Sequence, residues 1–401
     1  MAKYFPAHFQ VPGFLAAGIA AGIKKNGNPD LALIYAPHPA VAAGVFTTNR
    51  VKAAPVILSK ERLKGGYAQA VLINSGCANA CTGLRGIRDA QELAKSISAL
   101  LKIDPAKVLL ASTGVIGRPL PVTQIKKKLP LLVSALSADG LADVARAIVT
   151  TDTFPKAEKV KGKVNGREIT LAGIAKGAGM ISPQMATMLS FVLTDACISP
   201  HALKKCLQEQ VKETFNLVII DGDMSTNDTV LVLANGEAQN KMIEPDTTGY
   251  KKFSELLHQV LYALAEKIAR DGEGATKLVK IRVEGARSVA EAQKVARAVA
   301  CSPLVKTAFF GADANWGRIM CAAGYAGVNI DPNKIDIFFD KVQIVARGQG
   351  KGPVAEKKAT EIMKKKEYEV RLNLHQGRER AFVLTTDLSY DYIKINAAYR
   401  T

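Results

Sequence analysis

Short runs of small or β-branched residues, each bounded by Pro, Gly or Asn, recur along the chain and alternate with helical segments. The clearest pair lies at residues 159–164 and 167–172, on either side of Asn165-Gly166. Both central positions of a two-residue hairpin turn favour positive φ, which Asn and Gly adopt readily, so this segment predicts a β-hairpin. The chain as a whole predicts an interleaved α/β or α+β fold.

The helical segments show apolar residues at spacings of three and four. Residues 88–101 and 288–300 are predicted to be helices, and Ser288 with Glu291 forms a capping box at the start of the second. A third helix is expected at residues 202–215. Further strands are predicted at 31–36, 41–47, 68–73, 108–112, 191–196, 217–220, 229–233, 335–339, 342–346 and 382–386.

Composition excludes several classes of protein. The chain has 401 residues, of which 48% are hydrophobic and 22% are charged. It is therefore too apolar to be disordered, and long enough to bury a core without disulfides. No linker, repeat or low-complexity segment separates lobes, so a domain boundary has to be inferred from the residues that carry the chemistry.

The formal net charge of +18 suits either a nucleic acid or a small anionic substrate as partner. The basic runs at 126–128 and 364–366 are short, are predicted to lie in helices, and carry no interleaved aromatic residues. No nucleic-acid-binding motif accompanies them. We therefore expect no nucleic-acid partner, while steering of an anionic substrate fits the charge.

Six cysteines are spread over the chain, and Cys77 and Cys81 have a metal-like spacing without a second pair to complete a site. We expect buried free thiols, no metal site and a cytoplasmic protein. The apolar stretch at 11–23 is interrupted by glycines, is too short to cross a bilayer, and is followed rather than preceded by lysines. It is therefore predicted to be mature sequence of a soluble protein with no membrane partner.

The common catalytic motifs are absent from the sequence. There is no P-loop, the glycines at 348–352 do not have dinucleotide-loop spacing, and the five histidines are scattered. A nucleophile that carries its own base remains: a threonine at a chain N-terminus has an α-amino group of pKa about 8, which accepts the hydroxyl proton. Ala186-Thr187 is a candidate cleavage site, although the residues alone leave other threonines open.

Residues 176–189, KGAGMISPQMATML, closely resemble the self-cleavage motif of the ornithine acetyltransferase family, the glutamate N-acetyltransferases of arginine biosynthesis. The resemblance covers nearly the entire chain. Further matching motifs lie at 74–83, 112–117, 150–153, 221–228, 271–276, 311–318 and 392–401.

This resemblance implies an α/β fold of layered sheets between helices, with the chemistry of N-terminal-nucleophile hydrolases. The chain would cut itself between Ala186 and Thr187 into an α chain, 1–186, and a β chain, 187–401. The Thr187 hydroxyl would then take acetyl from N-acetylornithine and pass it to glutamate, in a ping-pong cycle through an acetyl-threonine ester.

The family's functional residues are present at the matching positions. Thr113 (hydroxyl) and Gly114 (backbone N–H) match the oxyanion pair, which would stabilise the tetrahedral intermediates. The positions implied to contact substrate are Thr153, Lys176, Thr187, Glu273, Asn396 and Thr401. Lys176 suits an α-carboxylate and Glu273 suits an ammonium group.

Two positions depart from the family pattern: Cys77 stands where Asn is common, and Met224 where Thr or Ser is usual. Neither is a mapped contact, so they bear on loop packing alone. The resemblance further implies no cofactor and a heterotetramer of two α and two β chains. Whether acetyl-CoA serves as a second acetyl donor stays open.

Two rival functions stay open at this point. A self-cleaving amidase or aminopeptidase would use the same threonine and oxyanion pair, with water as the acyl acceptor. A basic nucleic-acid-binding protein is the non-enzymatic alternative, and its binding would fall steeply with salt.

Overall fold

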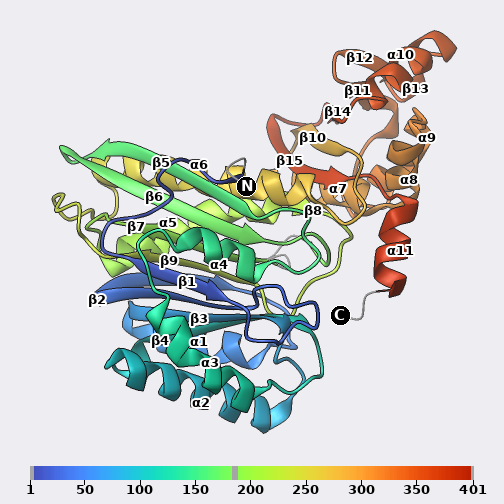
Figure 1. The fold of residues 1–401 in the computed structure, drawn as a ribbon. Helices are drawn as coiled ribbons and strands as arrows, with labels where there is room; N and C mark the ends of the chain where they lie inside the picture. The colour runs from blue at the N-terminus through green and yellow to red at the C-terminus, as the bar shows by residue number, and fades with distance from the viewer. Residues whose placement is uncertain (1–3, 183–187, 399–401) are drawn as a thin grey trace.

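The computed structural model describes residues 4–182 and 188–398, which form two β-sheets flanked by helices (Figure 1). The larger sheet has eight strands in the order β4-β3-β2-β9-β7-β6-β5, with β1 paired to β2. Its strands are β1 (Leu15–Ile19), β2 (Leu31–Phe46), β3 (Tyr67–Cys77), β4 (Val108–Val115), β5 (Lys156–Val164), β6 (Arg167–Lys176), β7 (Leu189–Thr194) and β9 (Thr229–Ala234).

The larger sheet bends at β2, which pairs with β3 along its first part and with β9 along its second. The register with β3 shifts between Tyr35 and Ala40. Pro37 and Pro39 lie in this interval, and proline has no N–H to donate to a ladder, which makes the interval a natural place for a bulge. The prediction of two separate strands at 31–36 and 41–47 is therefore wrong, because one strand continues through the irregularity.

The bend brings the two limbs of the sheet face to face. Their inner faces share one core, in which Ile73 of β3 and Leu109 of β4 are clustered with Ile174 of β6 and Phe191 of β7. These strands are several positions apart in the sheet order, so the core fills the space between the limbs. Helix α4 (Leu141–Ile148) adds Val144 and neighbouring residues to the same core.

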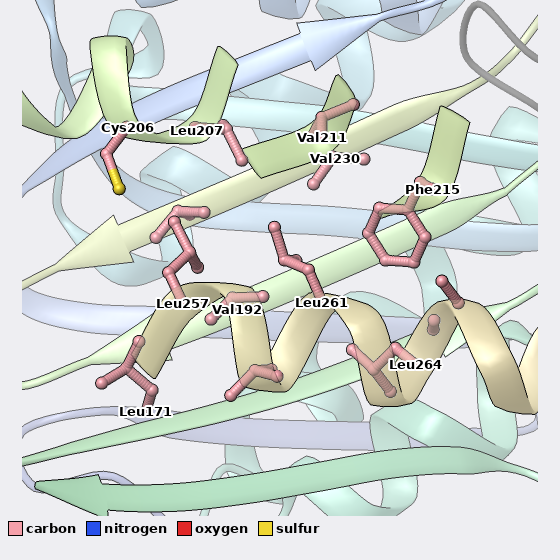
Figure 2. Packing of buried hydrophobic residues seen from close by; sticks show 14 of the residues in the cluster. Leu171, Val192, Cys206, Leu207, Val211, Phe215, Val230, Leu257, Leu261 and Leu264 are labelled. Carbon is pink, nitrogen blue, oxygen red and sulfur yellow. The ribbon is translucent and has the colours of Figure 1, made fainter. Parts of the chain in front are cut away.

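Helices cover the outer face of each limb. The first limb packs on α1 (Ala54–Arg62), α2 (Gly83–Leu101) and α3 (Val122–Ser134), and the second on α5 (Pro200–Lys212) and α6 (Thr248–Arg270). Figure 2 shows the second of these interfaces, where Leu257, Leu261 and Leu264 of α6 meet Leu207 of α5 over the strands. The prediction of layered sheets between helices is confirmed.

The second sheet has seven strands in the order β13-β12-β11-β14-β10-β15-β8 and lies beside the first (Figure 1). Its strands are β8 (Val218–Ile219), β10 (Leu278–Ala286), β11 (Asp336–Phe339), β12 (Val342–Ala346), β13 (Gln349–Gly350), β14 (Glu367–Asn373) and β15 (Glu379–Thr386). Its helices are α7 (Val289–Cys301), α8 (Pro303–Gly311), α9 (Trp316–Gly324), α10 (Pro353–Met363) and the C-terminal α11 (Tyr390–Ala398). Residues of this sheet and of α7–α10 share a second core.

Elements with a strong local signal are confirmed. Asn165 and Gly166 adopt φ values of 47° and 83° in the tight turn between β5 and β6. The Ser288 hydroxyl accepts a hydrogen bond from the Glu291 N–H at the start of α7. The strand predicted at 108–112 continues to Val115 as β4, so Thr113 and Gly114 lie inside it rather than after it.

Of the two basic runs, 126–128 lies inside α3, whereas 364–366 follows the end of α10. Among the helices in the described ranges, none combines the length and the apolar character that spanning a membrane requires.

Candidate active site

A cavity of about 190 Å³ lies where the two sheets meet. It is built from the ends of β4 and β6, the segment before β9, the turn after α6, and α11. Five of the residues that the sequence assigns to the site line it together: Thr113, Gly114, Lys176, Glu273 and Asn396. The other lining residues are Ile116, Thr150, Thr151, Gly179, Met180, Asp221, Asp223, Ser225, Thr226, Asn227 and Tyr392.

Gly114 occupies a position that no other residue type fits. Its φ is 126°, which L side chains rarely adopt, and a Cβ atom there would clash with the backbone of Gly76 and Cys77 on the parallel strand β3. The close approach keeps the end of β4 against β3. Asn227 fixes the same strand end, because its Nδ2 donates to the Ser112 carbonyl over 2.8 Å. The backbone at 113–114 is thus held rigidly at the wall of the cavity.

Lys176, the last residue of β6, is a buried cation beside this strand end. Its side chain is 4% exposed, and its Nζ donates to the Thr113 Oγ1 over 3.2 Å. Burial lowers the pKa of Lys176, while the nearby carboxylates of Asp152 and Glu273 oppose that shift. A cation held inside a small cavity attracts an anionic group of a ligand.

Glu273 and Asn396 form a second polar group in the lining of the cavity. The Asn396 Nδ2 donates to Glu273 Oε2 over 2.9 Å, which links α11 to the turn after α6. The Glu273 N–H donates to the Ala178 carbonyl over 2.8 Å, so Glu273 is tied to the chain just after Lys176. At Gly179 a Cβ atom would clash with the Glu273 carboxylate, so the absent side chain makes room for that group.

Thr153 is not among the lining residues. Its N–H donates to Asp271 Oδ2 over 3.0 Å, and its hydroxyl also donates to Asp271. The hydroxyl is therefore engaged with a protein carboxylate. Asp152 and Lys156 lie next to this pair and are buried with it, and sequence analysis assigned no role to these three charged residues.

Two further carboxylates that sequence analysis passed over lie in the matched motif at 221–228. Asp221 lines the cavity and accepts hydrogen bonds from the N–H groups of Met180 (2.6 Å) and Ile181 (2.8 Å), while burial raises its pKa. Asp228 is fully buried, and its Oδ1 accepts from the Met188 N–H over 3.0 Å. Burial raises the pKa of Asp228 well above its usual value, and its Oδ2 has no hydrogen-bond partner among the described residues.

Ala186, Thr187 and Thr401 lie outside the described residues, so the nucleophile, the cleavage site and the terminal contact stay predictions. The described chain resumes at Met188. The Met188 carbonyl accepts a hydrogen bond from the Thr229 N–H over 3.0 Å. Together with the Asp228 contact, this bond fixes Met188 beside the start of β9.

The two departures from the family pattern sit in loop contacts. The Cys77 thiol is buried and donates to the Arg118 carbonyl, and the Met224 sulfur accepts from the Thr48 hydroxyl. All six cysteines are free thiols. The expected burial is confirmed for Cys77 and Cys206, whereas Cys197 and Cys301 are half-buried and Cys81 and Cys321 are exposed. In the part of the chain that the structure describes, no group of three or more His, Cys, Asp or Glu side chains is arranged to hold a metal ion.

The family model of ArgJ matches residues 15–401. The arginine biosynthesis bifunctional protein ArgJ of Geobacter sulfurreducens is 51% identical over 391 residues, which cover 98% of this chain and 100% of that one. Its counterpart of the same name in Syntrophotalea carbinolica is 50% identical over 393 residues, with 98% and 100% covered.

Among solved structures, the arginine biosynthesis bifunctional protein argJ of Bacillus halodurans is 42% identical, with a TM-score of 0.51. The match covers 53% of this chain and 100% of that one. The chain therefore belongs to the ArgJ family and is an acetyltransferase of arginine biosynthesis.

Proposed function

We propose that this enzyme moves an acetyl group from N-acetylornithine to glutamate through an ester on the Thr187 hydroxyl, in the cavity between Thr113 and Glu273. The observation that carries the proposal is the contact between the buried Lys176 ammonium and Thr113, in a cavity that Glu273 also lines. A positive and a negative group in one small cavity match the carboxylate and the ammonium of an amino acid.

In this arrangement Lys176 pairs with the substrate α-carboxylate, and Glu273 with Asn396 receives the ammonium-bearing end. The Thr187 Oγ attacks the acetyl carbonyl of N-acetylornithine, and the α-amino group of Thr187 takes the hydroxyl proton and passes it to the departing ornithine nitrogen. Glutamate then attacks the ester with its amine. The Thr113 hydroxyl and the Gly114 N–H stabilise the oxyanion formed in both steps.

Thr187 gains its free α-amino group by self-cleavage in this proposal. Its hydroxyl oxygen attacks the Ala186 carbonyl carbon, the Ala186–Thr187 C–N bond breaks, and the nitrogen takes up a proton. Water then hydrolyses the ester, which leaves a carboxylate on Ala186 and restores the hydroxyl. The Bacillus halodurans chain supports this, because its whole length matches about half of this chain, as one product of a cut near position 187 would.

The finer features of the assembly belong to the same proposal. The substrates are small molecules, because the cavity holds about 190 Å³. The enzyme uses no cofactor, works in the cytoplasm, and assembles from two α chains, 1–186, and two β chains, 187–401. Native mass spectrometry tests this assembly, and a monomer of one uncut chain would contradict it.

The proposal is tested by an intact mass spectrum under denaturing conditions, followed by product analysis. We expect two chains joined in the precursor at Ala186-Thr187, and N-acetylglutamate formed from N-acetylornithine only when glutamate is present. Release of free acetate without N-acetylglutamate would identify the amidase alternative instead. Because the relatives are named bifunctional, the same assay is repeated with acetyl-CoA as donor, and we expect N-acetylglutamate there too.

A further inference from the structure

A lysine with no exposed side-chain surface lies between two carboxylates behind the cavity. The Lys156 Nζ is 2.6 Å from Asp152 Oδ1 and 2.5 Å from Asp271 Oδ2. All three side chains are at most 2% exposed, so we call them the buried triad. Its members come from the loop before β5, from β5 itself and from the end of α6.

The carboxylates of the buried triad are next to the backbone of the cavity wall, Asp152 through hydrogen bonds and Asp271 through its place in the chain. Asp152 Oδ1 accepts from the Gly177 N–H over 2.7 Å, directly after Lys176, and Asp152 Oδ2 accepts from the Thr150 N–H over 3.0 Å. Asp271 lies two residues before Glu273 in the turn after α6. Lys156 therefore joins the backbone that carries the cavity's cation to the backbone that carries its anion.

Stability alone is a weak reason for such a group. Removing charges from water carries a large free-energy cost, and buried ion pairs are often replaced by apolar side chains without loss of stability. Burial by itself would raise the pKa of Asp152, but the ammonium groups of Lys156 and Lys176 outweigh it and hold that pKa well below its usual range. Asp152 thus stays ionised and keeps its contact with Lys156, as a spacer requires.

We propose that Lys156 is a positioning residue, which through Asp152 and Asp271 fixes the separation between Lys176 and Glu273 and thereby selects the length of the amino-acid substrate. This inference rests on the proposed function, in which those two residues bind the two ends of the substrate. Thr153 acts through the same unit, because its hydroxyl and N–H are bound to Asp271.

Lys156 also influences the charge of Lys176. The charged groups that face Lys176 come from five segments: Asp152, Lys156, Glu273, Asp228 and Lys24. Burial lowers the pKa of Lys176, Asp152 opposes that shift, and Lys156 lowers the pKa further. Removing the Lys156 charge therefore raises the pKa of Lys176, and the loss of substrate binding at alkaline pH moves to higher pH.

The test compares steady-state acetyl transfer by the wild-type enzyme with three variants. Lys156→Met removes the central cation, but this substitution leaves two buried carboxylates without their positive partner. The charge-balanced variant Lys156→Met/Asp271→Asn avoids that cost, and Lys156→Arg keeps the charge while changing its geometry. Lys161→Met is the matched control, because Lys161 lies on the same strand β5 and pairs with Glu168 at the surface.

We expect the charge-balanced variant to cut itself and to turn over, with KM for N-acetylornithine raised about tenfold and kcat changed less than about threefold. Its preference for N-acetylornithine over the Nα-acetyl derivatives of 2,4-diaminobutyrate and lysine, whose side chains are one methylene shorter and longer, should fall about tenfold. Its loss of substrate binding at alkaline pH should move to higher pH. Lys156→Arg should raise KM without this change in the pH profile, and Lys161→Met should match the wild type.

A folded charge-balanced variant with wild-type KM, donor preference and pH profile would overturn the inference while leaving the proposed function intact. Failure of all three Lys156 variants to fold, beside a folded Lys161→Met, would also overturn it, because Lys156 would then serve folding alone. Absence of acetyl transfer by the wild-type enzyme would instead overturn the proposed function.

Discussion

The Nζ atom of Lys176 donates a hydrogen bond to the Oγ1 atom of Thr113 over 3.2 Å, although the two residues are 63 positions apart in the chain. Lys176 ends β6 and Thr113 lies near the end of β4, and four other strands separate β6 from β4 in the sheet order. The contact exists because the sheet bends at β2 and brings its two limbs together. It joins the candidate substrate cation to the candidate oxyanion pair.

Thr113→Val is expected to lower kcat for acetyl transfer by about 10²–10³-fold, because it removes one oxyanion donor worth about 2.7–4 kcal/mol. It keeps the size and branching of the side chain, so the fold should persist. Thr113→Ser, which keeps the hydroxyl, should retain most of the activity. Equal losses in the Val and Ser variants would show that the hydroxyl is not the group that matters.

Thr187→Ala is expected to give one uncut chain with no acetyl transfer, because the residue is then without the hydroxyl that performs both reactions. Intact mass under denaturing conditions and product analysis measure the two effects. Thr187→Ser should still be cut. A cut and active Thr187→Ala enzyme would show that another residue is the nucleophile.

Gly114→Ala is expected to destabilise the protein by about 1–3 kcal/mol or more, because alanine is strained at a φ of 126° and its Cβ would clash with Gly76. Thermal unfolding measures the loss. Gly311→Ala is the control, since Gly311 ends α8 and a Cβ there meets nothing within 4 Å, so its effect should stay within about 0.5 kcal/mol. Similar melting temperatures for the two variants would contradict the steric argument.

Asp228→Asn is expected to change how stability depends on pH. Burial raises the pKa of Asp228 above the 3.8 of an unfolded aspartate, so the folded state holds its proton where the unfolded state has released it. The stability from this group is fully present below pH 3.8 and is lost as pH rises through the folded pKa. Asparagine does not titrate, so the variant should gain melting temperature relative to the wild type as pH rises from 4 to 8.

Asp139→Asn is the control for this measurement, because Asp139 carries the same side chain at the exposed surface of the folded protein. Its melting curve should run parallel to that of the wild type at every pH. If Asp228→Asn also runs parallel, the carboxyl of Asp228 is ionised in the folded protein throughout this range.

Elements with local causes were predictable from the sequence. The hairpin at Asn165-Gly166 depends on two residues that tolerate positive φ, and α7 depends on a capping serine next to an amphipathic run. The prediction of a break in the strand between residues 36 and 41 was wrong for a non-local reason. The prolines there interrupt the pairing with β3, but pairing with β3 and β9 on either side keeps β2 continuous.

The candidate site was predictable as a set of residue types but not as a set of contacts. Thr153 was assigned to the substrate, which stays a prediction, and the sequence did not reveal that its hydroxyl donates to Asp271. The charged residues Asp152 and Asp271 stood in matched motifs, but a carboxylate in a sequence does not reveal which cation it will meet. Lys156 carried no signal at all, because a lysine in a strand is usually at the surface.

Motifs, turn residues and periodic patterns act over a few neighbouring positions, so the sequence predicted the family, the residue types of the candidate site and the local elements. The contact of Lys176 with Thr113, the contact of Glu273 with Asn396 and the burial of Lys156 between two aspartates are visible only in the folded chain. These contacts depend on the bend of the larger sheet at β2 and on packing between segments that are distant in the chain, because Thr113 and Lys176 are 63 positions apart and Lys156 and Asp271 are 115 positions apart.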